Sequence, residues 1–178
     1  MSQGLSPTLK SAMHSFEQIS LRPAASEDQE FLFGVYANTR EEEMKLWGWS
    51  VQQQEVFLRM QFDVRRRSYI TAYPSAEESI IIHADLPVGS MMISRSSAEI
   101  RLVDIAVVSE YRNRGIGTGL IGALTKEAAR STTVLRLSVL QGNPAIHLYE
   151  RLGFVVTGRD SMYLEMEYQP SPNVEKVP

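Results

Sequence analysis

The stretch YRNRGIGTGL (111–120) carries most of the information about the fold. It contains two arginines and three glycines at alternate positions, and the amphipathic run LIGALTKEAARS (120–131) follows it. Because glycine has no Cβ atom, its backbone can adopt unusual φ angles and let a ligand such as a phosphate come close. Glycines at this spacing before a helix are therefore typical of a phosphate-binding loop.

Two common phosphate-binding loops do not fit this stretch. Gly117, Gly119 and Gly122 match G-x-G-x-x-G, but in a dinucleotide-binding fold the glycines directly follow a strand and an acidic residue ends the next one. Here SEYRNR (109–114) precedes the glycines, and the next strand-like run is followed by Gln141. A P-loop requires a lysine that the stretch lacks. Neither loop is predicted.

The spacing Arg112-x-x-Gly115-x-Gly117 fits a third kind of loop. Successive N–H groups of residues 113–118 can point into one concavity, and the N-terminus of the following helix adds partial positive charge. Both glycines allow unusual φ angles, and Arg112 and Arg114 can form charge-assisted hydrogen bonds with phosphate oxygens. On this motif alone, an ordinary glycine-rich turn remains the alternative.

A second motif lies downstream in NPAIHLYERLGF (143–154). We expect Asn143 to cap a short helix, with Pro144 in its first turn and Gly153 at its end. One helix-like run and one strand-like run separate the two motifs. In this order they resemble the motifs of the GCN5-related N-acetyltransferase (GNAT) superfamily. The resemblance covers about residues 18–168 and is strongest over 99–156.

The resemblance implies an α+β (mixed α/β) fold, with a single central mixed sheet of six to seven strands flanked by about four helices. We expect this domain over residues 18–168, an N-terminal arm over 1–17 and a disordered tail over 169–178. Hydrophobic periodicity predicts helices over 26–44, 51–66, 120–131 and 143–153. It predicts strands over 18–23, 68–73, 79–84, 88–94, 99–108, 134–140, 154–159 and 161–168.

Local signals add detail to these elements. Ser26 and Ser50 are expected to cap the first two helices. Pro87 and Gly89 predict a turn, and the strands on either side of it are expected to pair in an antiparallel meander.

GNAT members bind acetyl-CoA between two parallel strands that splay apart, which here correspond to 99–108 and 134–140. Main-chain groups of the first strand are implied to bind the pantetheine arm and to position the thioester carbonyl. The full set of implied cofactor-binding residues is Ile105, Ala106, Val107, Arg112, Asn113, Arg114, Gly115, Ile116, Gly117, Thr118, Asn143 and Ala145.

Transfer of acetyl to an amine requires an acid and a base, and the resemblance implies that Tyr149 protonates the departing thiolate. A tyrosine suits this step because its pKa of about 10 lies above the value of about 8.5 for a thiol. Some relatives place a glutamate base where this chain has Leu102. Asp104 follows on the same strand, where a carboxylate is costly unless it is paired or functional. Asp104 is therefore either the base, acting directly or through water, or one partner of a structural ion pair with Arg101 or another arginine.

The resemblance implies an N-acetyltransferase that acts on a small-molecule or peptide amine acceptor. A non-catalytic acyl-CoA sensor or interaction module remains the alternative, because of Leu102. Other candidates for the base are Glu99, His83 and the run Glu41–Glu43, which is either a solvated helix end or a surface that attracts a cationic amine. Trp47 and Trp49 either line the acceptor site or pack together. A homodimer is one assembly that the family suggests.

Composition limits the other partners. The formal net charge of −3 lacks the basic surplus typical of nucleic-acid binders. The chain has no cysteine, which excludes disulfides and cysteine ligands, and its three histidines are scattered, so no metal site is expected. The start MSQGLSPTLK is not a secretory signal, and no apolar run approaches the roughly 20 residues of a membrane helix. We therefore expect a cytoplasmic protein with no membrane contact.

Overall fold

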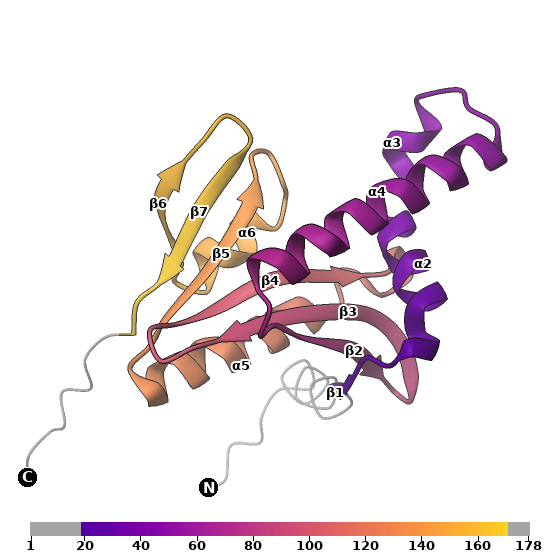
Figure 1. Ribbon diagram of the computed structural model, residues 1–178. Coiled ribbons are helices and arrows are strands. Elements are labelled where there is room, and N and C mark those ends of the chain that lie inside the picture. Colours follow the sequence, from indigo (N-terminus) through magenta and orange to yellow (C-terminus); the bar gives the residue numbers. More distant parts are fainter. Residues whose placement is uncertain (1–18, 171–178) are drawn as a thin grey trace, which may run out of the picture. The chain divides into compact units, whose positions relative to one another are not determined.

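The computed structural model describes residues 19–170 (Figure 1). The expected N-terminal arm (1–17) and residues 171–178 of the expected tail lie outside the described residues.

The described residues form seven strands and five α-helices, which confirms the predicted mixed α/β fold class. The strand order is β1-β2-β3-β4-β5-β7-β6. The strands are β1 (Ile19–Pro23), β2 (Glu77–His83), β3 (Leu86–Arg95), β4 (Glu99–Val107), β5 (Val134–Leu140), β6 (Val155–Arg159) and β7 (Tyr163–Tyr168). The helices are α2 (Gln29–Thr39), α3 (Glu41–Lys45), α4 (Val51–Ala72), α5 (Ile116–Ser131) and α6 (Ile146–Arg151), with short 3₁₀ helices η1 (Ser26–Asp28) and η2 (Ser109–Tyr111).

The chain divides into two compact units that both contain parts of β3 and β4. Within the described residues, the first unit comprises 19–92 and 104–116, and the second comprises 93–103 and 117–170.

In the first unit, β1 pairs antiparallel with β2, from Ile19↔His83 to Pro23↔Ser79. The helices of this unit pack together through a buried cluster of Tyr36, Met44 and Leu58, with partly buried aromatic rings around it. Burial of large apolar side chains supplies most of the free energy that holds such helices in place. The cluster therefore fixes α2 and α3 against α4.

The predicted helix over 26–44 is divided into η1, α2 and α3. The prediction that Ser26 caps it is wrong, because the Ser26 hydroxyl donates to Glu27. Asp28 caps the start of this segment instead. Its carboxylate accepts the backbone N–H of Ala25 at 2.8 Å and two hydrogen bonds from the guanidinium group of Arg22. The hydrogen bonds from Arg22 lower the pKa of Asp28 to about 2.

Helix α4 begins as predicted and ends later than predicted. The Ser50 hydroxyl accepts the backbone N–H of Gln53, whose side chain accepts the backbone N–H of Ser50, so the predicted cap is confirmed. The predicted strand over 68–73 is wrong, because α4 continues to Ala72. Arg65 donates from Nε to the Tyr69 hydroxyl at 2.9 Å, one helical turn away.

Gly89 lies inside β3, so the prediction of a turn through Pro87 and Gly89 is wrong. The turn between β2 and β3 instead uses Ala84 and Asp85, whose φ angles are +49° and +64°. A Cβ atom on Gly89 would lie 2.2 Å from the carbonyl oxygen of Ala106 on β4. The absence of a side chain at Gly89 therefore allows β4 to approach β3 closely.

In the second unit, β4 and β5 pair in parallel from Glu99↔Val134 to Leu102↔Leu137, and β5 pairs antiparallel with β7. The predicted apolar face of α5 is confirmed, since Leu120, Leu124 and Ala128 are buried. An ion pair of 2.7 Å between Arg95 and Glu127 joins the end of β3 to α5.

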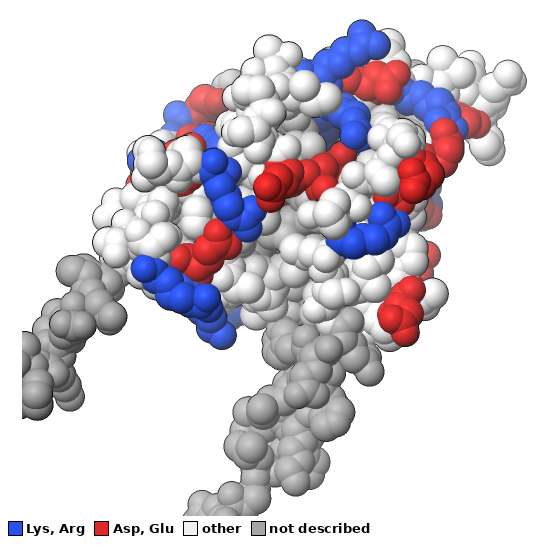
Figure 2. Space-filling view, turned by 60° about the horizontal axis from the view of Figure 1, so that its bottom comes forward, with Lys and Arg blue, Asp and Glu red and all other residues white. Residues whose placement is uncertain are grey.

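Arginines and glutamates alternate across β4, β5 and β7. Arg136 pairs with Glu99 at 2.6 Å and with Glu167 at 2.7 Å, and Arg101 pairs with Glu165 at 3.0 Å. Such cross-strand pairs of opposite charge favour one register of the strands. Acidic and basic residues are likewise interspersed over the face of the molecule in Figure 2.

Replacing Gly89 by alanine is expected to destabilise the protein by about 1–3 kcal/mol, because the new methyl group would overlap the carbonyl of Ala106. Urea unfolding followed by circular dichroism measures the change. Gly34→Ala is the matched control: a Cβ atom there meets nothing within 4 Å, and alanine favours the helix by about 0.5–1 kcal/mol. Equal stability of the two variants would contradict the assignment of Gly89 to a close strand contact.

Candidate active site

The loop after β4 has the unusual backbone conformation that the glycine spacing predicts at Gly115, but not at Gly117. Gly115 has a φ of +82°, and Asn113 has a φ of +59°, so two residues of the loop are left-handed. Helix α5 begins at the next residue, Ile116, and its first N–H groups have no partner within the helix. A loop with left-handed residues that runs directly into a helix N-terminus is a suitable cradle for an anion.

Gly117 is the exception, because it lies in the first turn of α5 and the prediction of an unusual φ is wrong there. A Cβ atom on Gly117 would lie 3.4 Å from the Leu148 side chain of α6. That distance is an ordinary van der Waals contact, so neither backbone freedom nor space against α6 requires glycine at this position.

Arg112 attaches the loop to β4 and to α2 through hydrogen bonds. Its Nε donates to the carbonyl oxygen of Val107 at 2.8 Å, and its Nη2 donates to Oδ1 of Asn38 at 3.1 Å. The same Asn38 oxygen accepts the backbone N–H of Ser109 at 2.7 Å. Helix α2 thus holds both ends of the segment 109–112 through one amide side chain. Arg114 lies over the ring of Tyr111, with its guanidinium carbon 4.9 Å from the ring centre.

The predicted pantetheine-binding residues, Ile105–Val107, form the end of β4. The parallel register between β4 and β5 runs only to Leu102↔Leu137, although β4 continues to Val107 and β5 to Leu140. Their role in binding the cofactor stays a prediction.

The second motif forms a helix that is shorter than predicted. Helix α6 begins at Ile146, so Asn143 lies three residues before it, where its side chain accepts the backbone N–H of Ala145 at 2.9 Å. Gly153 has a φ of +91° and ends the helix, as predicted. Asn143 therefore organises the turn before α6.

Tyr149 is buried on α6, with its ring 5.8 Å from that of Phe154. Its role as an acid stays a prediction. Tyr149 belongs to the second unit, together with Gly117, Thr118, Asn143 and Ala145. Asp104, the predicted base, belongs to the first unit, together with Ile105–Val107 and Arg112–Ile116.

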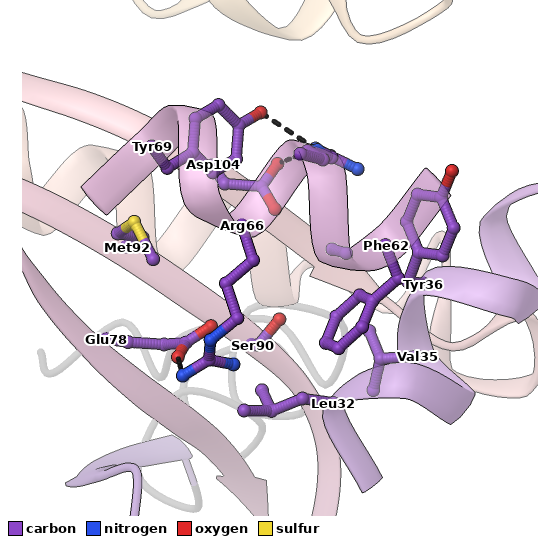
Figure 3. A pocket seen from close by; sticks show the side chains of 12 residues that line it. Leu32, Val35, Tyr36, Phe62, Arg66, Tyr69, Glu78, Ser90, Met92 and Asp104 are labelled. Atoms are coloured by element: carbon purple, nitrogen blue, oxygen red, sulfur yellow. Dashed lines mark hydrogen bonds and ion pairs between the residues drawn. The ribbon is translucent and has the colours of Figure 1, made fainter. Parts of the chain in front are cut away.

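A pocket of the first unit is lined by residues of α2, α4, β2, β3 and β4, and Asp104 is one of them (Figure 3). Two ion pairs line it: Arg65 donates to Asp104 at 2.5 Å, and Arg66 pairs with Glu78 at 2.8 Å. The remaining lining residues are Leu32, Val35, Tyr36, Phe62, Tyr69, Ser90, Met92 and Ala106. The pocket therefore combines apolar walls with two charged pairs.

Burial raises the pKa of Asp104, and the neighbouring Arg65 guanidinium opposes that rise. Burial likewise raises the pKa of Glu78, with Arg66 opposing and the charge of Asp104 reinforcing the rise. A carboxylate whose pKa is raised is a stronger proton acceptor when it is ionised, which is what a base needs. The sequence left open whether Asp104 forms an ion pair with an arginine. This ion pair is present, and its partner is Arg65, whereas Arg101 pairs with Glu165.

The other candidates for the base have local partners. Glu99 pairs with Arg136, and the His83 ring lies 5.9 Å from that of Tyr111. The run Glu41–Glu43 pairs with Lys45 and Arg40. The rings of Trp47 and Trp49 lie 4.8 Å apart and both pack on Phe57. None of these residues lines the pocket described above.

Four further residues of this region could not be predicted from the sequence, namely Asn38, Arg65, Arg66 and Glu78. Each acts through a partner far away in the chain, such as Asp104 for Arg65 or Ser109 for Asn38. The run of three arginines at 65–67 was the only local signal.

Two other kinds of feature are absent from residues 19–170. No group of three or more His, Cys, Asp or Glu side chains is arranged to hold a metal ion there. No helix in that range is both long and apolar enough to cross a membrane.

Comparisons with known proteins agree with the motifs. Residues 75–156 match the family model of the acetyltransferase (GNAT) domain. No curated protein matches the chain significantly.

Among solved structures, the PaiA N-acetyltransferase from Thermoplasma acidophilum in complex with coenzyme A is 19% identical, with a TM-score of 0.62 over 85% of this chain and 98% of that one. A GNAT family acetyltransferase from Elizabethkingia anophelis with acetyl-CoA bound is 14% identical, with a TM-score of 0.57 over 86% and 99%. At these identities the likeness concerns the fold. The family model identifies residues 75–156 as a GNAT domain, and the fold and the two motifs agree with this assignment.

Proposed function

We propose that this protein is an acetyl-CoA-dependent N-acetyltransferase that transfers an acetyl group directly to a primary amine. The GNAT domain at residues 75–156 supports acyl-CoA-dependent acetyl transfer as the general activity. The observation that carries the proposal is the loop 112–116, in which two left-handed residues lead directly into the N-terminus of α5. This geometry suits the diphosphate of coenzyme A.

The residues present fit this cosubstrate. The N–H groups of the loop supply hydrogen bonds to phosphate oxygens, and Arg112 keeps the loop attached to β4 and α2. The main chain of Ile105–Val107 would hold the pantetheine arm and orient the thioester carbonyl. A backbone N–H group at that place would stabilise the negative charge that develops on the carbonyl oxygen.

In the reaction, the amine nitrogen attacks the thioester carbon, a C–N bond forms, and the C–S bond breaks. An alkyl ammonium with a pKa of about 10 must lose a proton before it can attack. Asp104 would accept that proton, directly or through a water molecule. Tyr149 would give a proton to the sulfur of coenzyme A as it leaves, and the second proton that the nitrogen loses as the amide forms would restore the Tyr149 hydroxyl through solvent. The products are an N-acetyl compound and coenzyme A.

The activity test is incubation with acetyl-CoA and a panel of primary amines, with release of the free thiol measured by a colorimetric reagent. We expect turnover that depends on both the protein and the amine. No turnover with any amine, despite measurable binding of coenzyme A, would favour the non-catalytic acyl-CoA sensor instead.

The loop is tested by Gly115→Ala. An L-residue with positive φ is strained by about 1–2 kcal/mol, so the affinity for coenzyme A is expected to fall roughly tenfold in calorimetry. Gly122→Ala is the matched control, because Gly122 lies within α5 and a Cβ atom there meets nothing within 4 Å. Equal affinities of the two variants would remove the loop from the cofactor site.

The acid is tested by Tyr149→Phe, which keeps the ring against Phe154 and removes the hydroxyl. General acid catalysis contributes about 100-fold to 10,000-fold, so kcat is expected to fall by that factor while binding of acetyl-CoA is retained. Tyr168→Phe is the matched control, because Tyr168 also packs on Phe154, at 6.0 Å. An unchanged rate in Tyr149→Phe would remove the acid assignment and leave the fold untouched.

A further inference from the structure

The pocket of the first unit has a charge pattern that restricts which amines it can accept. Two arginines and two carboxylates line it, as the pairs Arg65–Asp104 and Arg66–Glu78. Figure 3 shows Arg66 reaching from α4 toward Glu78, beside Ser90 and Leu32. The pocket therefore presents positive and negative groups in equal number.

A ligand with only a positive charge is poorly matched to this pattern. Its ammonium would be attracted by Asp104 and Glu78, but it would also meet the two guanidinium groups. A ligand that carries one positive and one negative charge can satisfy both kinds of group, and complementary charges determine specificity in such sites.

Arg66 is the residue that is best placed to bind an anion. Its Nη2 pairs with Glu78, whereas its Nη1 is buried and has no hydrogen-bond partner among the described residues. A buried guanidinium N–H without a partner costs free energy and calls for an explanation, such as a ligand that completes the site. The planar fork of arginine matches the two oxygens of a carboxylate.

Arg65 differs from Arg66 in its hydrogen-bond partners. Its Nε donates to the Tyr69 hydroxyl and its Nη2 to Asp104, so it holds this carboxylate in place. Asp104, held in this way, is the carboxylate that we assign to the amine, because it is the candidate base of the proposed reaction, and Arg66 is assigned to an anion. Leu32, Val35, Phe62 and Met92 add apolar side chains to the lining, which a hydrocarbon group of a ligand can contact.

We propose that the acceptor is a small amino acid-like zwitterion, which places its carboxylate on Arg66, its amine toward Asp104 and an apolar side chain against the walls of the pocket. This inference rests on the proposed N-acetyltransferase function and adds the class of its acceptor.

The test compares ligands that differ only in the carboxylate. Binding of L-leucine and L-phenylalanine is measured by calorimetry in the presence of coenzyme A, next to isopentylamine and 2-phenylethylamine. Each amino acid is expected to bind at least tenfold more tightly than the amine that lacks its carboxylate. Equal binding of the two members of each pair, or no binding of either amino acid, would overturn the inference.

Two substitutions break the same ion pair and are expected to act in opposite directions. Arg66→Gln should remove the preference for the amino acid, whereas Glu78→Gln should strengthen it, because the whole guanidinium fork of Arg66 becomes available. A merely structural role of the pair would make both variants weaker. Arg67→Gln is the matched control, since Arg67 is the exposed next residue on α4 and does not line the pocket.

Acetyl transfer, measured by thiol release on the same four compounds, separates this inference from the proposed function. Equal acetylation of amines with and without a carboxylate would leave the function standing and refute the acceptor class. Arg66-dependent binding of the amino acids without any acetylation would support the binding site and refute the function.

Discussion

The ion pair between Arg65 and Asp104 is the constraint on which the first unit depends. Asp104 lies on a strand among largely apolar neighbours, where removal from water penalises its charge. A partly buried carboxylate is stabilised when it is paired, and α4 supplies the partner at 2.5 Å. The pairing determines which face of α4 turns toward β4. Arg65 also donates from Nε to the Tyr69 hydroxyl, one turn further along α4. The ion pair acts together with the buried cluster of Tyr36, Met44 and Leu58, which packs α4 against α2 and α3.

The strands and the loop could be predicted from the sequence because their signals are local. The alternation in VLRLSVL is found as alternating burial along β5, and the left-handed Gly115 follows from a residue type that tolerates that backbone. The predicted strand over 68–73 failed because Tyr69, Ile70 and Thr71 favour strands only by intrinsic propensity. Helix hydrogen bonds and the contact with Arg65 outweigh that weak preference. Gly89 was misjudged for a related reason, since glycine marks both turns and close backbone contacts, and only tertiary structure distinguishes them.

The candidate site could be predicted from sequence only where it is continuous in the chain. The spacing of Arg112 and Gly115 identifies the loop, but Asn38, which binds both Arg112 and Ser109, comes from α2 and carries no signal of its own. The same holds for Asp104, for which the sequence left two roles open. The structure shows that one of these roles, the ion pair, is occupied, and a paired carboxylate in a pocket can still accept a proton when its pKa is raised by burial.

Arg65 and Arg66 show why acceptor specificity escapes a reading of the sequence. Consecutive residues of a helix project about 100° apart, since 3.6 residues make one turn. Two adjacent arginines can thus reach carboxylates on two different strands, Asp104 on β4 and Glu78 on β2. Arg65 uses two of its nitrogens on fixed partners, whereas one nitrogen of Arg66 is buried without a partner among the described residues. The two neighbouring arginines therefore differ in the N–H donors that remain for a ligand, and this difference depends on the strand that each arginine faces.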